Sequence, residues 1–466
     1  MTKLASAGLS FLRSLEVRLE SPESGRFVAF VLVALTAALT AIFTWVAHQQ
    51  DLDAQMPEFI GLMLLAGILY VIAVFCVERS RLGAIALIVI VVGAVLFRVT
   101  LLPAQSELSG DVYRYQWDGR AQRAHLNPYV VFPNADDLEY LQNPAHPEPP
   151  GEDTPTFYPP LAELTYRRIE TVPGYKRVST LLDLASGGLL LLLLRARKQP
   201  MHRLLAYLWN PAVLLSFAMS GHFDTLAIVT FLAALLFLLT NRPAASMASL
   251  ALAVLSKFFP LLLLPAFLKR ARLRHFGLFA LLIFAFYLPF LNAGLHLLDG
   301  AGNYARDWTN NASLFNLLHF VGRSRPGAEL LAGLILLAAV AHLAKKRADP
   351  LLASLVLTSG VLLVSPTAYP WYFTWSLPFL CFYPNAAWLL MSVTCVLGYT
   401  PAITYAAGEP LQHSLLMLSL EYAPVYLWLA YYCWAARLVG SDRQWPAQCP
   451  EPVAHTPNWD RKIGGV

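Results

Sequence analysis

The segment "LGAIALIVIVVGAVLFRVTLL", Leu82 to Leu102, decides the fold class of this chain. Its residues are almost all apolar, and Arg98 is the only charged one. An α-helix needs about 20 predominantly apolar residues to cross the hydrocarbon core of a bilayer. We therefore predict that Leu82–Leu102 is a transmembrane helix.

Apolar segments of this kind recur along the chain and predict an all-α polytopic membrane protein. The 466 residues are 57% hydrophobic and 14% charged, whereas about a quarter of the residues are charged in a typical soluble domain. In such a protein the net charge of +5 reflects basic cytoplasmic loops, so we expect no nucleic-acid partner. We predict a bundle of about 12–14 transmembrane helices. The predicted spans besides Leu82–Leu102 are Phe27–Ala47, Phe59–Val77, Val178–Leu194, Leu204–Met219, Leu226–Thr240, Phe276–Leu291, Leu330–Leu343, Leu351–Val364, Tyr372–Tyr383, Ala386–Leu397 and Leu415–Ala436.

Lysine and arginine set the predicted orientation, because basic loops remain in the cytoplasm. Four basic connections satisfy this rule if Ala245–Arg270 is a pair of short helices that turn at "SKFFP", where Lys257 and Pro260 interrupt the apolar pattern. Broken helices are tolerated at membrane depth where protein or a wet cavity covers the freed backbone groups. The basic connections are Glu78–Arg81, Arg195–Arg203, Lys269–His275 and Lys345–Arg347, and the large connections then left outside are Pro103–Pro173, Asn292–Gly327 and Ser365–Phe373.

The polar stretch "SELSGDVYRYQWDGRAQRAHLNPY", Ser106 to Tyr129, lies near the start of the largest outer connection. Its pattern predicts a short amphipathic helix, Asp111–Arg123, that lies on the membrane face. Ser109 or Asp111 is expected to cap this helix, and Asn127-Pro128 is expected to end it. The stretch is either an interfacial anchor or an active-site loop, and composition alone does not choose between the two.

Other polar and aromatic residues recur at the predicted outer ends of the spans. His222 and Asp224 lie in "SGHFD" between two spans, and Lys257 lies at the turn of the broken hairpin. Tyr158 and Glu163 lie where the first outer connection re-enters the membrane. Titratable groups that gather on one membrane face favour a site for a ligand that is half lipid and half polar.

Each of these residues also has a structural interpretation. Lys257 without a ligand would extend its ammonium to the interface as a snorkelling side chain. His222 and Asp224 would otherwise cap the helix that follows them. Arg98 and Asp183, placed about a turn inside the predicted membrane, are expected to form a structural ion pair.

The sequence offers no metal-ligand pattern. The five cysteines fall mostly in apolar segments without a C-x-x-C pair and are expected in the core. Asp51-Leu52-Asp53 has the D-x-D spacing, but it stands in a short predicted outer loop without a supporting motif. We therefore assign no metal ligand, and a divalent cation such as Mg²⁺ or Mn²⁺ stays open as an alternative cofactor.

Four motifs, taken in chain order, resemble one enzyme superfamily. They are "SGDVYRYQWDGRAQRAHLNPY" (Ser109–Tyr129), "YPPLAEL" (Tyr158–Leu164), "WNPAVLLSFAMSGHFD" (Trp209–Asp224) and "LSKFFPLLLLP" (Leu255–Pro265). Together they resemble the polytopic GT-C glycosyltransferases. Within that superfamily they are most similar to the bacterial polyprenyl-phosphate-dependent mannosyltransferases, including the mycobacterial α-1,6-mannosyltransferase type.

The resemblance also implies an organisation of the chain into three parts. Residues 1–81 would form an N-terminal cytoplasmic segment and two extra transmembrane helices. Residues 82–438 would form the GT-C-like catalytic core, with 103–173 as its large extracytoplasmic loop. Residues 439–466 would form a cytoplasmic tail.

The resemblance implies an inverting glycosyltransferase in the bacterial inner membrane. It would move a sugar, with mannose favoured, from a polyprenyl-phosphate donor to a lipid-linked or polysaccharide acceptor on the extracytoplasmic face. Asp111 occupies the place of the family's catalytic base. Because a phosphate leaving group needs charge stabilisation more than a proton, we expect Arg114, Arg120 and Lys257 to bind the donor phosphate. The expected sugar- or acceptor-binding residues are Asp118, Tyr158, His222, Asp224, Trp371 and Tyr372.

Two alternatives keep the membrane location but change the activity. A transporter or flippase of lipid-linked sugars would predict paired inverted halves, with broken helices and ionisable groups near the membrane midplane. The sequence instead predicts one broken segment, and most polar groups lie at one membrane border. A GT-C-type glycan ligase or polymerase that uses a polyprenyl diphosphate would call for more outer cations than this chain has.

Overall fold

The computed structural model describes residues 22–80, 82–105, 108–143, 149–267, 271–406 and 413–438. The predicted cytoplasmic tail, 439–466, and the chain before residue 22 lie outside the described residues. The described chain is built from helices and contains no named strand. Asn310 and Thr367 form an isolated parallel bridge.

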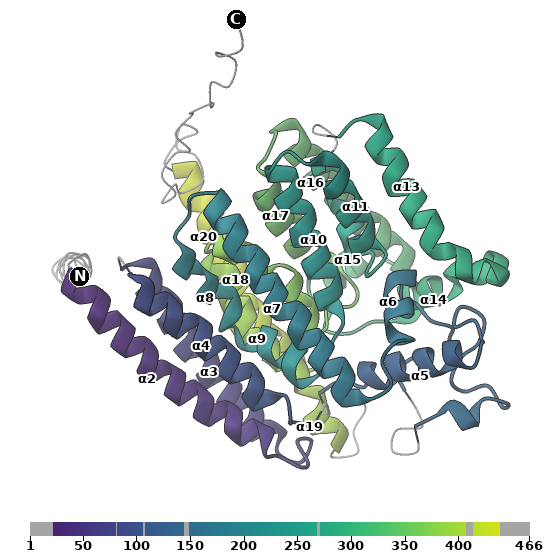
Figure 1. Ribbon diagram of the computed structural model, residues 1–466, viewed down its shortest axis with the longest axis horizontal. Helices are drawn as coiled ribbons and strands as arrows, with labels where there is room; N and C mark the ends of the chain where they lie inside the picture. Colours follow the sequence, from purple (N-terminus) through teal and green to yellow (C-terminus); the bar gives the residue numbers. More distant parts are fainter. Residues whose placement is uncertain are drawn as a thin grey trace, which may run out of the picture.

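Most of the α-helices are labelled in Figure 1. Several predicted spans are divided into shorter pieces. In chain order the segments are α2 (Pro22–Ala47), α3 (Met56–Glu78), α4 (Ala84–Leu101), α5 (Asp111–Arg123), η1 (Glu139–Leu141), α6 (Pro160–Tyr166), α7 (Val172–Ala196), η2 (Met201–Leu204), α8 (Leu205–Leu208), α9 (Pro211–Leu214), η3 (Leu215–Met219), α10 (Asp224–Leu239), α11 (Pro243–Val254), η4 (Phe259–Leu263), α12 (Leu264–Phe267), α13 (Leu273–Tyr287), η5 (Leu288–Leu298), α14 (Asp299–Asp307), α15 (Leu314–Gly322), α16 (Arg325–Lys345), α17 (Pro350–Val364), η6 (Pro370–Trp375), η7 (Leu377–Cys381), α18 (Ala386–Thr394), η8 (Cys395–Tyr399), α19 (Pro401–Ala406) and α20 (Leu415–Leu438).

Seven helical segments of the described chain are long and apolar enough to cross a membrane. The all-α polytopic fold predicted from the sequence is therefore confirmed. The span count is lower than the predicted 12–14 because several apolar segments are short or broken. The predicted span Leu204–Met219, for example, is divided at Asn210-Pro211, where proline removes a backbone donor and disfavours helix at the residue before it.

The predicted broken hairpin is present. After α11 ends at Val254 the chain turns through Lys257 and resumes as η4. The freed carbonyl of Leu255 accepts hydrogen bonds from the backbone N–H of Leu161 and Ala162 in the first large outer connection. The broken backbone is therefore stabilised by the loop that packs against it, as required for a break at membrane depth.

A second break lies at "SGHFD". The segment Pro211–Met219 and α10 are bent by 118° relative to one another. The N-cap of α10 is Phe223, without a side-chain capping hydrogen bond. The capping interpretation of His222 and Asp224 is therefore wrong, and both side chains are available for other contacts.

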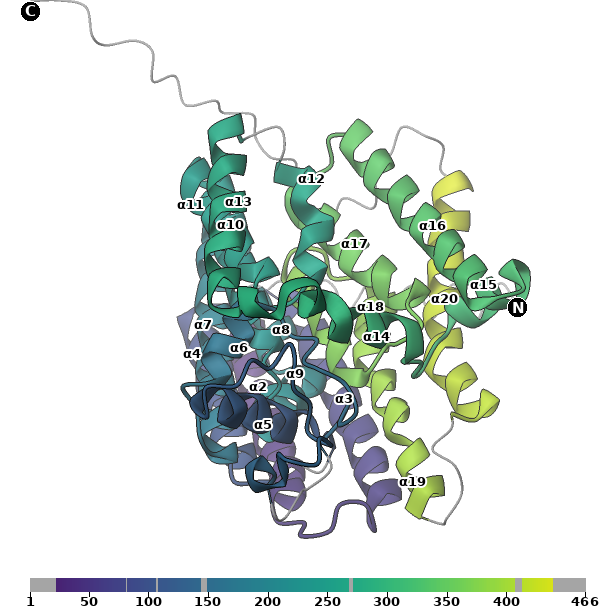
Figure 2. The ribbon, with the colours of Figure 1, turned by 90° about the vertical axis from the view of Figure 1, so that its right-hand side faces the viewer.

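The three predicted outer connections contact one another at one end of the bundle. Asn127 donates to the side-chain oxygen of Asn292 over 2.6 Å, and Asn303 donates to Thr154 Oγ1 over 3.0 Å. The second and third connections meet at the Asn310–Thr367 bridge. In Figure 1, α5, α6 and α14 lie on the right-hand side of the molecule, and Figure 2 shows them from that side.

The predicted ion pair between Arg98 and Asp183 is confirmed. Arg98 Nε lies 2.6 Å from Asp183 Oδ2, and both side chains are buried. The guanidinium also donates to the carbonyls of Ala94 and Leu208. The pair joins α4 to α7 inside the bundle, because a buried charge requires a partner of opposite sign and further hydrogen bonds.

Candidate active site

Helix α5 presents Asp111 at its first residue. The helix has the predicted bounds, Asp111–Arg123, but most of its residues are buried. The prediction of an amphipathic helix on the membrane face is therefore wrong. The capping prediction is also wrong, because the N-cap is Gly110 without a capping side chain, and Ser109 Oγ only accepts the Asp111 N–H over 3.2 Å.

An aromatic cluster fixes α5 against the "SGHFD" turn. The ring of Tyr115 stacks on Tyr166 at 4.6 Å and meets Phe223 edge to face at 5.7 Å. Tyr175 donates its hydroxyl to the carbonyl of Tyr115 over 3.0 Å. Aromatic pairs of this geometry add about 0.5–1.5 kcal/mol each beyond their area burial. The start of α5 is therefore held close to His222, which precedes Phe223.

The turn itself is shaped by an unusual stretch of helix. Leu215–Met219 is π-helical, a form that occurs often at functional sites. Gly221 follows with φ of +73°, and a Cβ there would meet Lys176 at 3.0 Å. The carbonyl of His222 accepts the Ser179 hydroxyl over 2.7 Å. The backbone at His222 is therefore fixed by α7.

His222 and Asp111 face one another. His222 Nδ1 lies 3.4 Å from Asp111 Oδ2, and the Asp111 side chain remains 17% exposed whereas His222 is 1% exposed. The imidazole stacks on the indole of Trp371, with ring centroids 4.2 Å apart. Three of the predicted site residues are thus brought together from α5, the "SGHFD" turn and η6.

A second polar pair lies beside the first. Lys257 Nζ is 2.6 Å from Asp224 Oδ1, which also accepts the indole N–H of Trp375 over 2.6 Å. The ammonium stands over the ring of Tyr372, 4.5 Å from its centroid. Lys257 is therefore oriented by a carboxylate and aromatic faces rather than snorkelling freely.

Lys257 lines a cavity of about 500 Å³ between the predicted outer connections and the broken hairpin. Its walls are mainly aromatic and aliphatic, and a second charged residue, Glu329, is paired with Arg325 at 3.0 Å. The lining residues are Phe157, Tyr158, Pro159, Lys257, Phe258, Phe259, Leu262, Ala301, Tyr304, Ala305, Glu329, Val361, Leu362, Ser365, Pro366, Thr367, Tyr372 and Trp375. The cavity is thus apolar with a cation at its wall.

Trp371 links this cavity to Asp111 and His222. Its indole stacks on His222 and meets the ring of Tyr372, which lines the cavity, edge to face at 5.9 Å. Asp111 itself does not line the cavity. We refer to Asp111, His222, Asp224 and Lys257 with this cavity as the candidate site.

The arginines of α5 make contacts within the protein. Arg114 is fully buried, binds Asp118 at 3.0 Å, and donates to the carbonyls of Gly151 and Thr154. Arg120 donates to the carbonyls of Leu141 and Gln142. These contacts direct both guanidinium groups to the loop that follows α5, and neither residue lines the cavity.

Asp118 belongs to a buried carboxyl pair with Glu163. Thr156 Oγ1 bridges the two, 3.2 Å from Asp118 and 2.7 Å from Glu163. Burial raises the pKa of both carboxyl groups, and the charge of Asp118 raises that of Glu163 further. When two carboxyl groups are buried side by side, the repulsion between their charges favours the protonated form of one of them. The arrangement stabilises the loop between α5 and α6.

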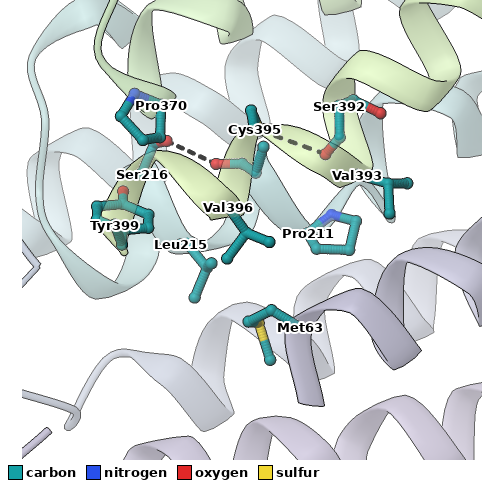
Figure 3. Close-up of a pocket in the computed structure, with 11 residues that line it drawn as sticks. Met63, Pro211, Leu215, Ser216, Pro370, Ser392, Val393, Cys395, Val396 and Tyr399 are labelled. Carbon is teal, nitrogen blue, oxygen red and sulfur yellow. Dashed lines mark hydrogen bonds between the residues drawn. The ribbon is translucent and has the colours of Figure 1, made fainter. Parts of the chain in front are cut away.

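A small cavity of about 20 Å³ lies beneath the π-helical turn (Figure 3). Met63, Leu215, Ser216 and Tyr399 are among its lining residues. Its volume is close to that needed for one water molecule, so it is too small for a sugar. Within the described ranges, no group of three or more His, Cys, Asp or Glu side chains is arranged to hold a metal ion.

Tyr304 and Trp375 line the cavity and make polar contacts there, but they were not among the predicted site residues. The hydroxyls of Tyr304 and Tyr372 lie 2.7 Å apart, and Trp375 binds Asp224. Tyr304 lies in the second predicted outer connection. Its aromatic side chain near a predicted membrane border could have marked it as a candidate site residue. Trp375 stands at the end of "PTAYPWYFTW", which the sequence placed at the same membrane level.

Comparison with protein families identifies the chain. Residues 25–274 match the family model described as alpha-(1->6)-mannopyranosyltransferase, N-terminal domain. The match covers more than half of the 466 residues and includes α2 and α3 as well as Asp111, His222 and Lys257. A search of curated proteins finds no match. The chain therefore belongs to the MptA_B family of alpha-(1->6)-mannopyranosyltransferases.

Proposed function

We propose that this mannosyltransferase uses a polyprenyl-phosphate mannose donor and transfers the sugar, with inversion, to a lipid-linked or polysaccharide acceptor. The observation that carries the proposal is the candidate site. It combines an apolar cavity of about 500 Å³, a lysine in its wall and a partly exposed carboxylate nearby. Such a site suits a substrate that joins a long apolar chain to a charged group.

The donor is assigned to the cavity by its chemistry. The polyprenyl chain would occupy the aromatic and aliphatic walls, and the phosphate would bind Lys257. Asp224 and Trp375 hold the lysine in place, so the cation is preorganised for the negative charge that develops on the leaving phosphate. The proposal retains Tyr158 and Tyr372 as residues that contact the sugar or the chain.

Asp111 is the proposed general base. It would accept the proton of the acceptor hydroxyl while that oxygen bonds to the anomeric carbon. The bond from the anomeric carbon to the phosphate oxygen breaks at the same time, and the phosphate leaves with the electron pair. One displacement inverts the configuration at the anomeric carbon, so a second carboxylate is not required as nucleophile.

Three predicted site residues are left out of the mechanism. Arg114 and Asp118 are fully buried and bound to each other. Arg120 is bound to two backbone carbonyls. Moving any of these side chains toward a substrate would leave buried polar groups without partners, which costs about 1–3 kcal/mol per group.

We place the reaction on the extracytoplasmic face of a bacterial inner membrane. The orientation is supported by the basic connections, because Arg195–Arg203 and Lys345–Arg347 adjoin the ends of α7 and α16 that lie away from the three outer connections. Lysine and arginine remain in the cytoplasm during insertion.

The test is mannosyl transfer by purified protein in proteoliposomes, with polyprenyl-phosphate mannose and an alkyl α-mannoside acceptor. Asp111→Asn is compared with Asp137→Asn, an exposed aspartate of the same outer connection. We expect the first variant to lose about 10²–10⁴-fold in kcat and the second to match wild type. Parallel reactions with EDTA and with added Mg²⁺ or Mn²⁺ measure the contribution of a divalent cation.

An Asp111→Asn protein that folds and transfers mannose at the wild-type rate would exclude Asp111 as the base. A wild-type protein that uses a nucleotide-activated mannose but ignores the polyprenyl donor would exclude the proposed donor. Analysis of the anomeric configuration in the product tests inversion separately from both.

A further inference from the structure

The geometry points to His222 as a positioning residue that fixes the orientation of the Asp111 carboxylate. The inference rests on the proposed role of Asp111 as base. The sequence had suggested that His222 binds a sugar hydroxyl. The structure instead buries the imidazole and turns Nδ1 toward Asp111 Oδ2.

The first support is the rigidity of the backbone that carries His222. Its N–H donates to the Ser216 carbonyl over 2.9 Å, next to the π-helical bond from Ser220 N to Leu215 O. The carbonyl of His222 accepts the Ser179 hydroxyl. Gly221 supplies the positive φ that turns the chain here, a conformation that costs L-residues with a Cβ. The unusual backbone geometry of this turn therefore fixes the place from which the His222 side chain extends.

The second support is the fixed plane of the ring. The imidazole and the indole of Trp371 stack with an interplanar angle of 18°, and Trp371 in turn stacks on Tyr369 at 4.5 Å. With 1% of the side chain exposed, the ring has no space to rotate toward solvent. The position of Nδ1 is thus set by packing, which is what a supporting group of an active site requires.

The third support is the set of ring contacts. Among the described residues, neither ring nitrogen of His222 has a hydrogen-bond partner. The nearest acidic atom to Nδ1 is Asp111 Oδ2, at 3.4 Å. Buried polar atoms are normally hydrogen-bonded, so an unpartnered imidazole next to a partly exposed carboxylate indicates a contact that tightens when substrate binds.

The consequence concerns the two oxygens of Asp111. Oδ2 is directed to His222, which leaves Oδ1 to accept the proton of the acceptor hydroxyl. A general base acts only within hydrogen-bond reach of that proton, and a displacement of about 1 Å can cost about 100-fold in rate. His222 would therefore contribute to kcat without contacting the substrate.

Two substitutions separate this role from simple packing. His222→Phe keeps an aromatic ring against Trp371 but removes both nitrogens. His222→Asn removes the ring but places an amide nitrogen near the position of Nδ1. We expect His222→Phe to lower kcat about 10- to 100-fold with little change in the KM for the donor, and His222→Asn to retain most of the wild-type kcat. Thermal unfolding and size-exclusion profiles of both proteins verify their folding.

The activities of both His222 variants are then measured in the Asp111→Asn background. If His222 acts through Asp111, His222→Phe causes no further loss in that background, because groups that act as a unit are non-additive. Full activity of His222→Phe, or equal losses with and without Asp111, would overturn the inference while leaving the proposed base intact. An Asp111→Asn enzyme with wild-type activity would instead overturn the proposed function itself.

Discussion

The ammonium of Lys257 lies 2.6 Å from Asp224 Oδ1, and it is this pair that gives the apolar cavity its cation. Asp224 is 1% exposed and the lysine side chain 18% exposed. The two residues come from α10 and from the turn of the broken hairpin. The break in the hairpin therefore has a direct consequence, because it brings a lysine to the wall of an apolar cavity.

Removing either charge of this pair is expected to destabilise the protein, and removing the lysine is expected to abolish transfer. Lys257→Gln leaves the buried Asp224 unpaired, which costs about 3 kcal/mol. The double variant Lys257→Gln with Asp224→Asn restores most of the stability but none of the activity. Thermal unfolding in detergent and the transfer assay measure the two effects separately. Recovery of activity in the double variant would show that the lysine acts only in folding.

Narrowing the cavity is expected to weaken binding of long polyprenyl donors. Ala301 on α14 lines the cavity, and Ala301→Trp would exclude part of the chain. Excluding two CH₂ groups costs about 1.6 kcal/mol, which corresponds to a KM about 15-fold higher. A donor with a short chain should be affected less. Gly302→Trp is the matched control, because nothing lies within 4 Å of a Cβ at Gly302.

Much of the fold could be predicted from the apolar pattern. The segment Leu82–Leu102 is realised as α4 (Ala84–Leu101), because about 20 apolar residues leave few alternatives to a spanning helix. The prediction was less successful where proline interrupts such a segment. Tyr372–Tyr383 forms the end of η6 and all of η7 instead of one span, and Pro378 within it was a visible signal.

Part of the candidate site could be predicted from the sequence, because a charged residue in a membrane segment has few possible roles. Lys257 and Asp224 were singled out because charges in apolar surroundings are costly, and they form a pair. Arg114 could not be interpreted in this way. Besides Asp118, its partners include the backbone carbonyls of Gly151 and Thr154, whose proximity depends on how the long loop folds back on α5. Sequence position gives no access to such a contact.

Gly119 is expected to tolerate no side chain, although it lies within a helix. A Cβ there would come within 2.5 Å of the Tyr166 carbonyl oxygen, so Gly119→Ala must separate α5 from α6. We expect a loss of about 1–3 kcal/mol and reduced transfer, because Asp111 stands on α5. The control is Gly188→Ala in α7, where nothing lies within 4 Å and helix propensity favours alanine by about 1 kcal/mol. Equal unfolding temperatures for the two variants would contradict this account.

The buried Glu163 is expected to make stability depend on pH. Its pKa is raised well above the ordinary value of 4.5, first by burial and then by the charge of Asp118. In the interval above pH 4.5 the folded state therefore binds more protons than the unfolded state, so the free energy of unfolding falls as pH rises toward the folded pKa.

Glu163→Gln keeps an uncharged hydrogen-bonding group beside Thr156. We expect this variant to match wild type near pH 4.5 and to unfold at a higher temperature at pH 8. Thermal unfolding across this range at constant ionic strength, with Asp137→Asn as control, gives the slope. A wild-type protein that gains stability between pH 5 and 8 relative to Glu163→Gln would show that Glu163 is ionised in the folded state.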